Sequence, residues 1–466
     1  MQFLENYLSA SIESTLETII EDEMKSNKLP GVSVAIVADQ SVIWANGFGY
    51  ADIATNQLVT TDTIFAVGSI TKLITATMLM QLRDSGKINL DDPVQKHLPA
   101  LNLQSTGNNG RPITIRQIAS HTAGLPREIS FEGWHTLQFP TADEFLQEMK
   151  KLTAIFPPLS RYKYSNLGYT ILGQVLSQIA GVPYKKYVLD HILKPLGMNR
   201  SGFDLAELPA GLATGYAVFG NEPIEKAPYL NFGAMAPAGQ LFSSVLDMSR
   251  FVSLQFLEED SEGAADDNRI HSILEPATIR EMHMPVYIGK KWVGGTGIGW
   301  HITRALAHTI SSHRGGIPGF TTDIVLDRDI KLGVIVFTNA FPQPNEIAVR
   351  IFELLVPVIV AKIAGESQVP SDEVPVEAYG IYTGKYRSRY FGEIEIRITN
   401  GRLVMSDLLA PKGLETTLMP AGKHRFIMSG GDEDGEFAIF EESSEGGVKS
   451  VNTAGYKFDR QGPLAR

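Results

Sequence analysis

Segments with strand patterns near both ends of residues 1–364 enclose a helix-rich middle, and this order constrains the fold more than any other feature. GVSVAIV at 31–37 and SVIWANGFGYAD at 41–52 predict two paired strands joined by a short polar turn. From about residue 292, four further segments read as strands with tight turns: GTGIGWHI, HTISSHRGG, FTTDIVLD and KLGVIVFTN. We therefore expect an antiparallel sheet flanked by helices, with a helical insert, in an α/β (α+β) layered domain.

Three helices are predicted around this sheet. The N-terminal run from about Leu8 to Lys25 places apolar residues at helical spacing on one face. A second helix, about Ile70 to Ser85, is apolar nearly all round and ends at Gly86, a residue suited to a helix C-terminus. The strongly apolar run from Asn345 to about Ala364 predicts a helix that closes the domain. Between them, residues 88–304 favour helices and loops punctuated by proline and glycine.

A polar linker, GESQVPSDEVP at 365–375, divides the chain. Beyond it the segments are short, alternate apolar and polar residues, and are bounded by Gly, Asn, Asp or Pro. That pattern is typical of antiparallel strands in a small sandwich or barrel. We expect one domain over 1–364, the linker, and an all-β domain over 376–466. The acidic stretch Glu258–Asp267 is predicted to be a surface loop.

The chain is acidic and has no cysteine, which excludes several classes of function. A formal net charge of −11 argues against nucleic-acid or membrane partners, whose surfaces require clustered Lys and Arg. Without cysteine there is no disulfide framework, thiolate nucleophile or Cys-ligated zinc. The N-terminus lacks the form of a signal peptide, and no run reaches the roughly 18 apolar residues of a membrane span. We expect a cytoplasmic protein, or a periplasmic or secreted one if a leader has been removed.

No cofactor or metal is expected. The run GGTGIG at 294–299 lacks the Lys-Ser/Thr of a phosphate-binding loop and precedes a strand. The pairs His271/His283 and His301/His308 lack helical ligand spacing and a carboxylate partner.

The first chemistry-bearing pattern is Ser69 followed three residues later by Lys72. Ser69 comes just after Gly68, where the predicted helix begins, so unpaired N–H groups and the positive end of the helix dipole would favour negative charge beside it. Lys72 shares its face. A lysine within an apolar helix is costly to bury unless it is used, and a depressed pKa would let it take the serine proton. The alternative is an N-cap serine and an ordinary first-turn lysine.

Two further patterns, one at Tyr164 and Asn166 and one at His313 to Gly316, indicate catalysis more strongly when they are considered together with Ser69 and Lys72. Tyr164 could be stabilised as a phenolate near an ammonium and act as a base, and Asn166 could bind a substrate carbonyl and hold Lys72. Alone, this segment is also explained as capping before a helix. On the predicted strand that includes His313, Gly315 permits close approach of a substrate, and the N–H of Gly316 could form an oxyanion hole with that of Ser69. His313 could donate a hydrogen bond to the substrate or Tyr164.

The ordered Ser-x-x-Lys, Tyr-x-Asn and His-x-Gly trio resembles that of the serine β-lactamase and penicillin-binding-protein clan, best in its class C-like branch. That branch includes esterases, D-aminopeptidases and D-Ala-D-Ala carboxypeptidases. The resemblance extends over about residues 15–360 through four further phrases: IASHTAGLP (118–126), KPLGMNRSGF (194–203), PAGQLFSSVLDMSRFV (237–252) and GGIPGFTTDIVLD (315–327).

The resemblance implies roles for individual residues. Ser69 would be acylated, Lys72 and Tyr164 would share proton transfer, Asn166 would position the substrate and Lys72, and His313 would line the site. It also implies that the C-terminal domain is lipocalin-like. One departure is that His313 and Arg314 stand where many members have Lys-Thr before the glycine, so the cation that attracts a β-lactam carboxylate is missing.

The expected function is therefore a serine hydrolase that forms an acyl-enzyme on ester or amide substrates, peptide-like and including D-amino acid derivatives. The alternatives are a β-lactamase or D-Ala-D-Ala carboxypeptidase, an acyltransferase that uses the same site, and a non-catalytic penicillin-binding-like scaffold. The expected partner is a small ester, amide or short peptide, and the C-terminal domain is expected to mediate homo-oligomer assembly or access to the site.

Overall fold

The computed structural model divides the chain into two compact units, Met1–Ala361 and Lys362–Arg466, which are described separately. The described residues are 2–3, 8–101, 103–106, 111–128, 136–149, 152–219, 224–258, 273–291, 293–305, 308–341, 346–366, 376–388, 392–399, 401–407, 415–420, 423–429, 437–443, 447–453 and 456–462. Most of the predicted acidic loop at 258–267 lies outside these ranges.

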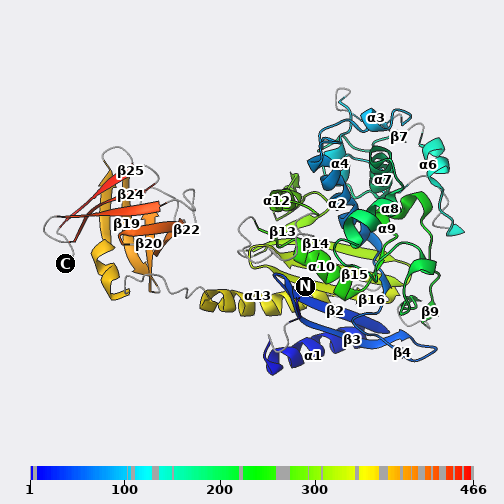
Figure 1. Cartoon of the computed structure of the whole chain (residues 1–466), viewed down its shortest axis with the longest axis horizontal. Coiled ribbons are helices and arrows are strands. Elements are labelled where there is room, and N and C mark those ends of the chain that lie inside the picture. Colours follow the sequence, from blue (N-terminus) through cyan, green and yellow to red (C-terminus); the bar gives the residue numbers. More distant parts are fainter. Residues whose placement is uncertain are drawn as a thin grey trace. The chain divides into compact units, whose positions relative to one another are not determined.

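The first unit is built on one large sheet that joins the two ends of its chain (Figure 1). Its order is β1-β3-β2-β16-β15-β14-β13-β12-β11, and β4 pairs with β3. The pairing is antiparallel apart from β1 with β3. The strands are β1 Gln2–Phe3, β2 Gly31–Ala38, β3 Ser41–Asp52, β4 Gln57–Leu58, β11 Tyr287–Ile288, β12 Gly294–Thr296, β13 His301–Ala305, β14 His308–Ile317, β15 Phe320–Asp327 and β16 Leu332–Thr338.

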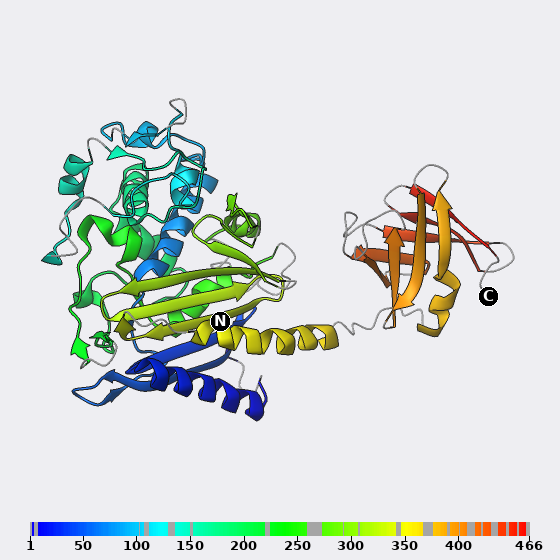
Figure 2. The ribbon, with the colours of Figure 1, turned by 180° about the vertical axis from the view of Figure 1, so that it is seen from behind.

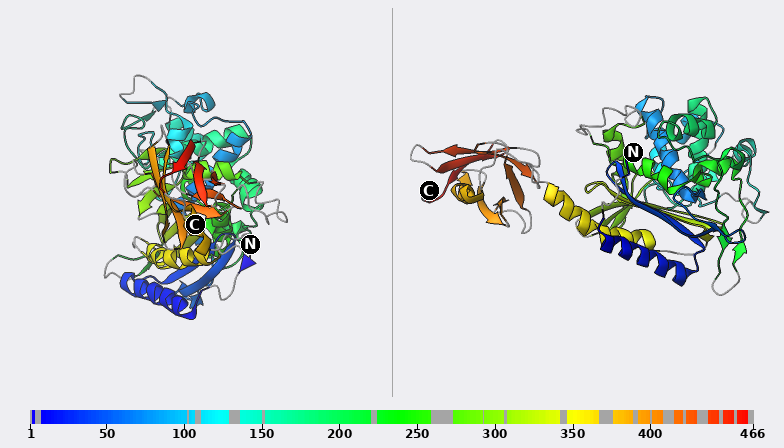
Figure 3. Two further views of the ribbon diagram at one scale, coloured as in Figure 1. Left: turned by 90° about the vertical axis from the view of Figure 1, so that its left-hand side faces the viewer. Right: turned by 60° about the horizontal axis from the view of Figure 1, so that its bottom comes forward.

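Both faces of this sheet are covered, and the two faces belong to different cores. Successive residues of a strand point to opposite faces, so on β2 Ala35 and Val37 join one core while Val34 and Ile36 join the other. The second core also contains α1 and α13, which lie side by side across one face (Figures 2 and 3). On the other face α10 contacts β2 and β16, and α2 and α10 both belong to the first core. This double cover explains why β2, β15 and β16 are apolar along almost their whole length.

The helices match the predicted order. In the described part of the chain they are α1 Ala10–Asn27, α2 Thr71–Asp84, α3 Val94–His97, α4 Ile115–Ala119, α6 Ala142–Glu148, α7 Asn166–Ala180, α8 Tyr184–Val188, α9 Ala236–Gly239, α10 Val245–Leu254, α12 Pro276–His283 and α13 Ile347–Glu366. None of these helices combines the length and apolar character that a membrane span needs. The smaller strands of this unit are β5 Phe65–Ala66, β6 Leu103–Gln104, β7 Leu152–Thr153, β8 Tyr216–Ala217, β9 Glu225–Lys226, β10 Phe242–Ser243 and β17 Ala340–Phe341.

The second unit contains a closed barrel of eight antiparallel strands, which confirms the all-β prediction and decides between barrel and sandwich. Its strands are β18 Gly384–Ser388, β19 Gly392–Thr399, β20 Arg402–Asp407, β21 Thr416–Pro420, β22 Arg425–Ser429, β23 Phe437–Glu442, β24 Val448–Thr453 and β25 Tyr456–Arg460. The aromatic side chains of Tyr382, Tyr386, Phe426 and Phe440 pack on one another in its core.

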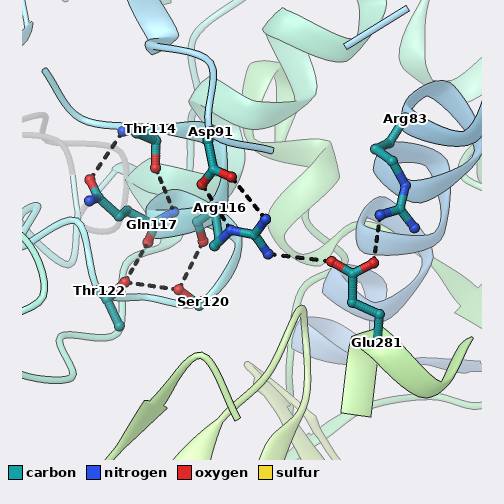
Figure 4. Close-up of polar contacts among 8 residues, drawn as sticks. All are labelled: Arg83, Asp91, Thr114, Arg116, Gln117, Ser120, Thr122 and Glu281. Atoms are coloured by element: carbon teal, nitrogen blue, oxygen red, sulfur yellow. Dashed lines mark hydrogen bonds and ion pairs between the residues drawn. The ribbon is translucent and has the colours of Figure 1, made fainter. Parts of the chain in front are cut away.

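A polar network in the first unit ties α2 to α4 and α12 (Figure 4). Glu281 on α12 accepts from Arg83 on α2 at 2.5 Å and from Arg116 on α4 at 3.4 Å. Arg116 also donates to both carboxylate oxygens of Asp91, at 2.9 and 3.0 Å. One carboxylate therefore bridges two arginines, one on α2 and one on α4.

We expect Glu281→Gln to lower the free energy of unfolding of this unit by about 1 kcal/mol, since a partly exposed ion pair contributes little more than that. The loss should shrink at high salt because screening already weakens the pairs. All four tryptophans precede residue 301, so fluorescence during urea unfolding reports on this unit in the intact chain. Glu17→Gln on the exposed side of α1 is the matched control, and equal losses in both variants would contradict the bridging role.

Candidate active site

Ser69 lies in a short turn of 3-10 helix, Gly68–Ile70, that leads directly into α2. Gly68 has a φ of +53°, and a Cβ there would come within 3.0 Å of the Gly316 backbone nitrogen. Thr322 on β15 donates its hydroxyl to the Val67 carbonyl at 2.8 Å, which holds the turn against the sheet. A glycine is needed at 68 because the turn needs both positive φ and close approach to β14.

Lys72 is the second residue of α2 and is fully buried, with its side chain directed back to Ser69. Its Nζ donates to the Oγ of Ser69 at 3.0 Å and to the carbonyl oxygen of Ala238 at 2.6 Å. Burial holds the pKa of Lys72 well below its ordinary value; the nearby carboxylate of Glu128 raises it and the Arg127 guanidinium lowers it further. Desolvation therefore accounts for the predicted fall in the pKa of Lys72 and shifts its equilibrium toward the neutral amine.

Tyr164 reaches the same oxygen from the other side. Its hydroxyl donates to the Oγ of Ser69 at 2.8 Å, and the Lys72 Nζ lies 4.9 Å from the centre of its ring. Burial raises the pKa of Tyr164 to about 12, although the hydrogen bond with Ser69 and the charge of Arg127 work in the opposite direction. Desolvation disfavours both the phenolate and the ammonium, so it opposes the charged pair expected from the sequence.

Asn166 begins α7, one residue after Ser165, which caps the helix by accepting from the Gly168 N–H. The amide nitrogen of Asn166 donates to Oε1 of Glu128 at 2.5 Å. The described hydrogen bonds of Lys72 go to Ser69 and Ala238, so the expected contact in which Asn166 holds Lys72 is replaced by one to Glu128.

His313 is buried on β14, with its ring centre 6.5 Å from that of Tyr164. Its Nδ1 lies 3.0 Å from the Arg314 carbonyl oxygen. Because a carbonyl only accepts, Nδ1 carries the proton and Nε2 is left as an acceptor. Among the described residues Nε2 has no partner. The expected donation from His313 to Tyr164 or to a substrate is therefore not the arrangement of this neutral ring, whose pKa is lowered by burial and by the neighbouring His301 and Lys72.

The two predicted glycines have different surroundings. Gly316 lines the same pocket as Ser69, as an oxyanion hole requires. A Cβ at Gly315 would lie 2.1 Å from the Val67 carbonyl oxygen, so close packing of β14 on the Ser69 turn accounts for this glycine rather than substrate contact.

The pocket at Ser69 has about 270 Å³ of empty space, including the part open to solvent. Its wall combines the polar Asn166 with apolar side chains; the lining residues are Ser69, Asn166, Phe232, Met235, Ala238, Gly239, Gly316 and Ile317. Phe232 and Met235 belong to a small separate cluster with Leu230, against which Phe139 and Ile317 pack. Ser69 therefore opens onto a small, largely apolar pocket with one side-chain amide on its wall.

A sequence profile described as Beta-lactamase matches residues 16–356, which is most of the chain. The chain belongs to the beta-lactamase family. A curated relative within it, Beta-lactamase-like protein 2 of Dictyostelium discoideum, is 30% identical over 352 residues. That match covers 74% of this chain but only 62% of the relative, so the chain spans less than two thirds of that protein's length.

Two solved structures extend the comparison. The octameric penicillin-binding protein homologue from Pyrococcus abyssi is 26% identical with a TM-score of 0.64, and the match covers 96% of this chain and 99% of that one. The beta-lactamase/D-alanine carboxypeptidase from Yersinia pestis is 25% identical with a TM-score of 0.60, over 76% of this chain and 100% of that one. The family and the fold expected from the motifs are both confirmed.

In this beta-lactamase family member, several residues around the site were not singled out from the sequence. Arg127 and Glu128 follow the phrase HTAGLP directly, and the guanidinium of Arg127 lies 5.0 Å from the Tyr164 ring centre. The backbone carbonyl that binds Lys72 comes from Ala238, inside another of the quoted phrases. The available signal was position directly after a recognised phrase for Arg127 and Glu128, and position within one for Ala238.

His121, which lies within the phrase IASHTAGLP, contacts the tyrosine motif. Its ring lies 4.4 Å from that of Tyr164, and its Nδ1 accepts from the N–H of Ser165 at 3.1 Å. The backbone of His121 has a φ of +57°, which is strained for a residue with a side chain. It therefore positions the segment between Tyr164 and Asn166. Across the described ranges, no group of three or more His, Asp and Glu side chains could hold a metal ion.

Proposed function

We propose that this family member is a serine hydrolase that forms an acyl-enzyme on Ser69 and acts on ester or amide bonds of small, peptide-like substrates. The observation that carries the proposal is the convergence of Lys72 and Tyr164 on one serine oxygen, in surroundings that keep the lysine an amine. A scaffold without activity has no need of a buried amine at a serine hydroxyl, which is costly to maintain.

Acylation follows from these contacts. With Lys72 neutral, its contact with Ser69 can reverse, so that the Oγ–H donates to Nζ. As Oγ bonds to the substrate carbonyl carbon, the proton moves to Nζ and the carbonyl electrons move to oxygen. Backbone N–H groups at Ser69 and Gly316 would bind that oxyanion. When the tetrahedral species collapses, the leaving group takes the Tyr164 hydroxyl proton, and the Lys72 ammonium then gives its proton to the Tyr164 phenolate, so that both groups return to their starting states. Water then attacks the ester by the same path in reverse.

A phosphonate probe and a p-nitrophenyl ester test the proposal on the intact chain. A fluorophosphonate should add to one serine, identified by mass spectrometry as Ser69, and should abolish p-nitrophenyl butyrate hydrolysis in proportion to labelling. Hydrolysis that persists in the fully labelled protein, or labelling elsewhere, would reject it. Adding methanol or an amine nucleophile separates hydrolysis from acyl transfer, because a transferase would release the alkyl ester or amide in place of the acid.

Tyr164→Phe should lower kcat for the p-nitrophenyl ester by about 10²-fold, the usual scale for loss of a proton donor or acceptor. Since the acid limb of the pH profile reports loss of the Lys72 amine, we expect that limb to stay in place while the whole profile drops. Tyr287→Phe, in a partly exposed strand residue of β11, is the control. A shifted limb with an unchanged plateau would show that Tyr164 acts only on the charge of Lys72.

β-Lactams are disfavoured within the proposal because His313, a neutral acceptor here, replaces the lysine cation. A chromogenic cephalosporin should therefore be turned over much more slowly than the ester.

The octameric state of the Pyrococcus abyssi homologue supports a self-assembled form of this chain, with a role for the C-terminal barrel. Light scattering on the full chain should give an integral multiple of 51.0 kDa greater than one.

A further inference from the structure

Glu128 places a carboxylate beside the proposed acylation site without a complete set of partners. Its Oε1 accepts from the Asn166 amide at 2.5 Å and lies 3.7 Å from Nε of Arg127. Its Oε2 is shielded from solvent and has no hydrogen-bond partner among the described residues. A buried carboxylate oxygen with no donor costs free energy in the unliganded protein, so the site is suited to a donor that arrives with a ligand.

The location of this carboxylate relates it to the substrate. Asn166, whose amide it binds, lines the pocket together with Ser69. The negative charge of Glu128 also raises the pKa of Lys72, so its field reaches the catalytic amine. Glu128 is therefore next to the pocket wall and not in a remote surface cluster.

The chemistry at this position favours a cation with several N–H groups. A carboxylate is acceptor-only, and it takes one of the two side-chain N–H groups of Asn166. The carbonyl oxygen of an acylamino group placed next to Glu128 would face the lone pairs of its carboxylate. An ammonium group brings three donors and the complementary charge, and charge-assisted hydrogen bonds are the stronger class.

The rest of the pocket indicates what carries that ammonium. Phe232, Met235 and Ile317 form an apolar wall on the Ser69 pocket. A carbonyl bonded to Ser69 has its α-carbon one bond away, and an α-amino acid places an amino group and a side chain on that carbon. One polar and one apolar contact surface within the same small pocket match those two substituents.

We infer that Glu128 is a specificity-determining residue that binds the free α-amino group of an apolar α-aminoacyl ester, amide or peptide N-terminus. This inference rests on the proposed Ser69 chemistry and names its substrate class. It makes the protein selective for unblocked amino termini, with the side chain held by Phe232, Met235 and Ile317.

Three p-nitroanilides that share one apolar side chain test it: leucine, N-acetyl-leucine and 4-methylpentanoyl p-nitroanilide, the first two in both D and L forms. The intact chain should have its highest kcat/KM for one free-amine form. In Glu128→Gln, the ratio of kcat/KM for the free amine to that for the N-acetyl compound should fall by about 10- to 100-fold, as expected for loss of a hydrogen bond to a charged group. Glu148→Gln, on the exposed surface of α6, should leave the ratio unchanged.

Other outcomes would overturn the inference in recognisable ways. If Glu128→Gln lowers kcat/KM equally for all three substrates and moves the acid limb of the pH profile to lower pH, Glu128 acts only by positioning Asn166 and raising the pKa of Lys72. If the intact chain shows no preference for the free amine, the recognition is absent. If no anilide is cleaved, inactivation rates by a pair of phosphonate diphenyl esters, with and without the α-amino group, give the same ratio. Failure of every phosphonate to label Ser69 would instead reject the proposed function itself.

Discussion

Ser69→Ala should reduce kcat/KM for the p-nitrophenyl ester by at least about 10⁴-fold, the scale on which removal of a covalent nucleophile acts. The reason is that Lys72 and Tyr164 both direct their hydrogen bonds to the Ser69 Oγ, so without that oxygen there is no bond-forming atom and no shared acceptor. The measurement is steady-state hydrolysis combined with intact-mass detection of the acyl-enzyme, which should vanish in the variant.

A matched control separates this loss from unfolding. Ser14→Ala changes an exposed serine of α1 and should keep full activity, and both variants should keep the tryptophan emission of the parent. If Ser69→Ala retains more than a few per cent of the activity, the nucleophile lies elsewhere and the acyl-enzyme on Ser69 must be abandoned.

Lys72→Met should lower kcat by about 10³-fold and at the same time raise Tm near neutral pH. The activity falls because the base is gone. The stability rises because the folded protein holds Lys72 with a pKa well below the ordinary 10.5, which penalises folding wherever the unfolded chain is protonated. Methionine has a similar length and no charge, although the Ala238 carbonyl loses its donor, which offsets part of the gain.

The pH dependence of this Tm difference is the decisive part. Between the folded-state pKa and 10.5 the unfolded chain binds more protons than the folded one, so the parent gains stability as pH rises through this window. The advantage of Lys72→Met should be greatest at neutral pH and fall as pH approaches 10.5. Lys87→Met, at an exposed position, should show no such trend. A difference independent of pH would mean that Lys72 titrates normally.

Much of the fold could be predicted because it depends on local periodicity. The paired strands β2 and β3, the buried helix α2 and the closing helix α13 lie within a few residues of their predicted positions. Alternation beyond residue 376 predicted the small all-β unit, but not whether its strands would close. Closure depends on pairing between its first and last strands, β18 and β25, which no local pattern records.

The candidate site likewise contains contacts that the sequence predicted and contacts that it did not. Ser69 and Lys72 are one helical turn apart, so their contact was determined by spacing in the sequence, and the motif order placed Tyr164 with them. The partners of Asn166 and His313 were not determined there. Whether Asn166 turns to Lys72 or to Glu128, and which nitrogen of His313 carries its proton, depends on side chains brought together from distant segments.

The pKa shifts of Lys72 and Tyr164 show most clearly what could not be predicted from the sequence. By itself the sequence determined the family motifs and pointed to Ser69, Lys72 and Tyr164 as the candidate nucleophile and proton carriers. Only the tertiary structure decided that burial lowers the pKa of Lys72 and raises that of Tyr164, and that a carboxylate with an unpartnered oxygen among the described residues stands beside the pocket. The physical reason is that desolvation and charge pairing depend on what surrounds a group in three dimensions, whereas the sequence records only its neighbours along the chain.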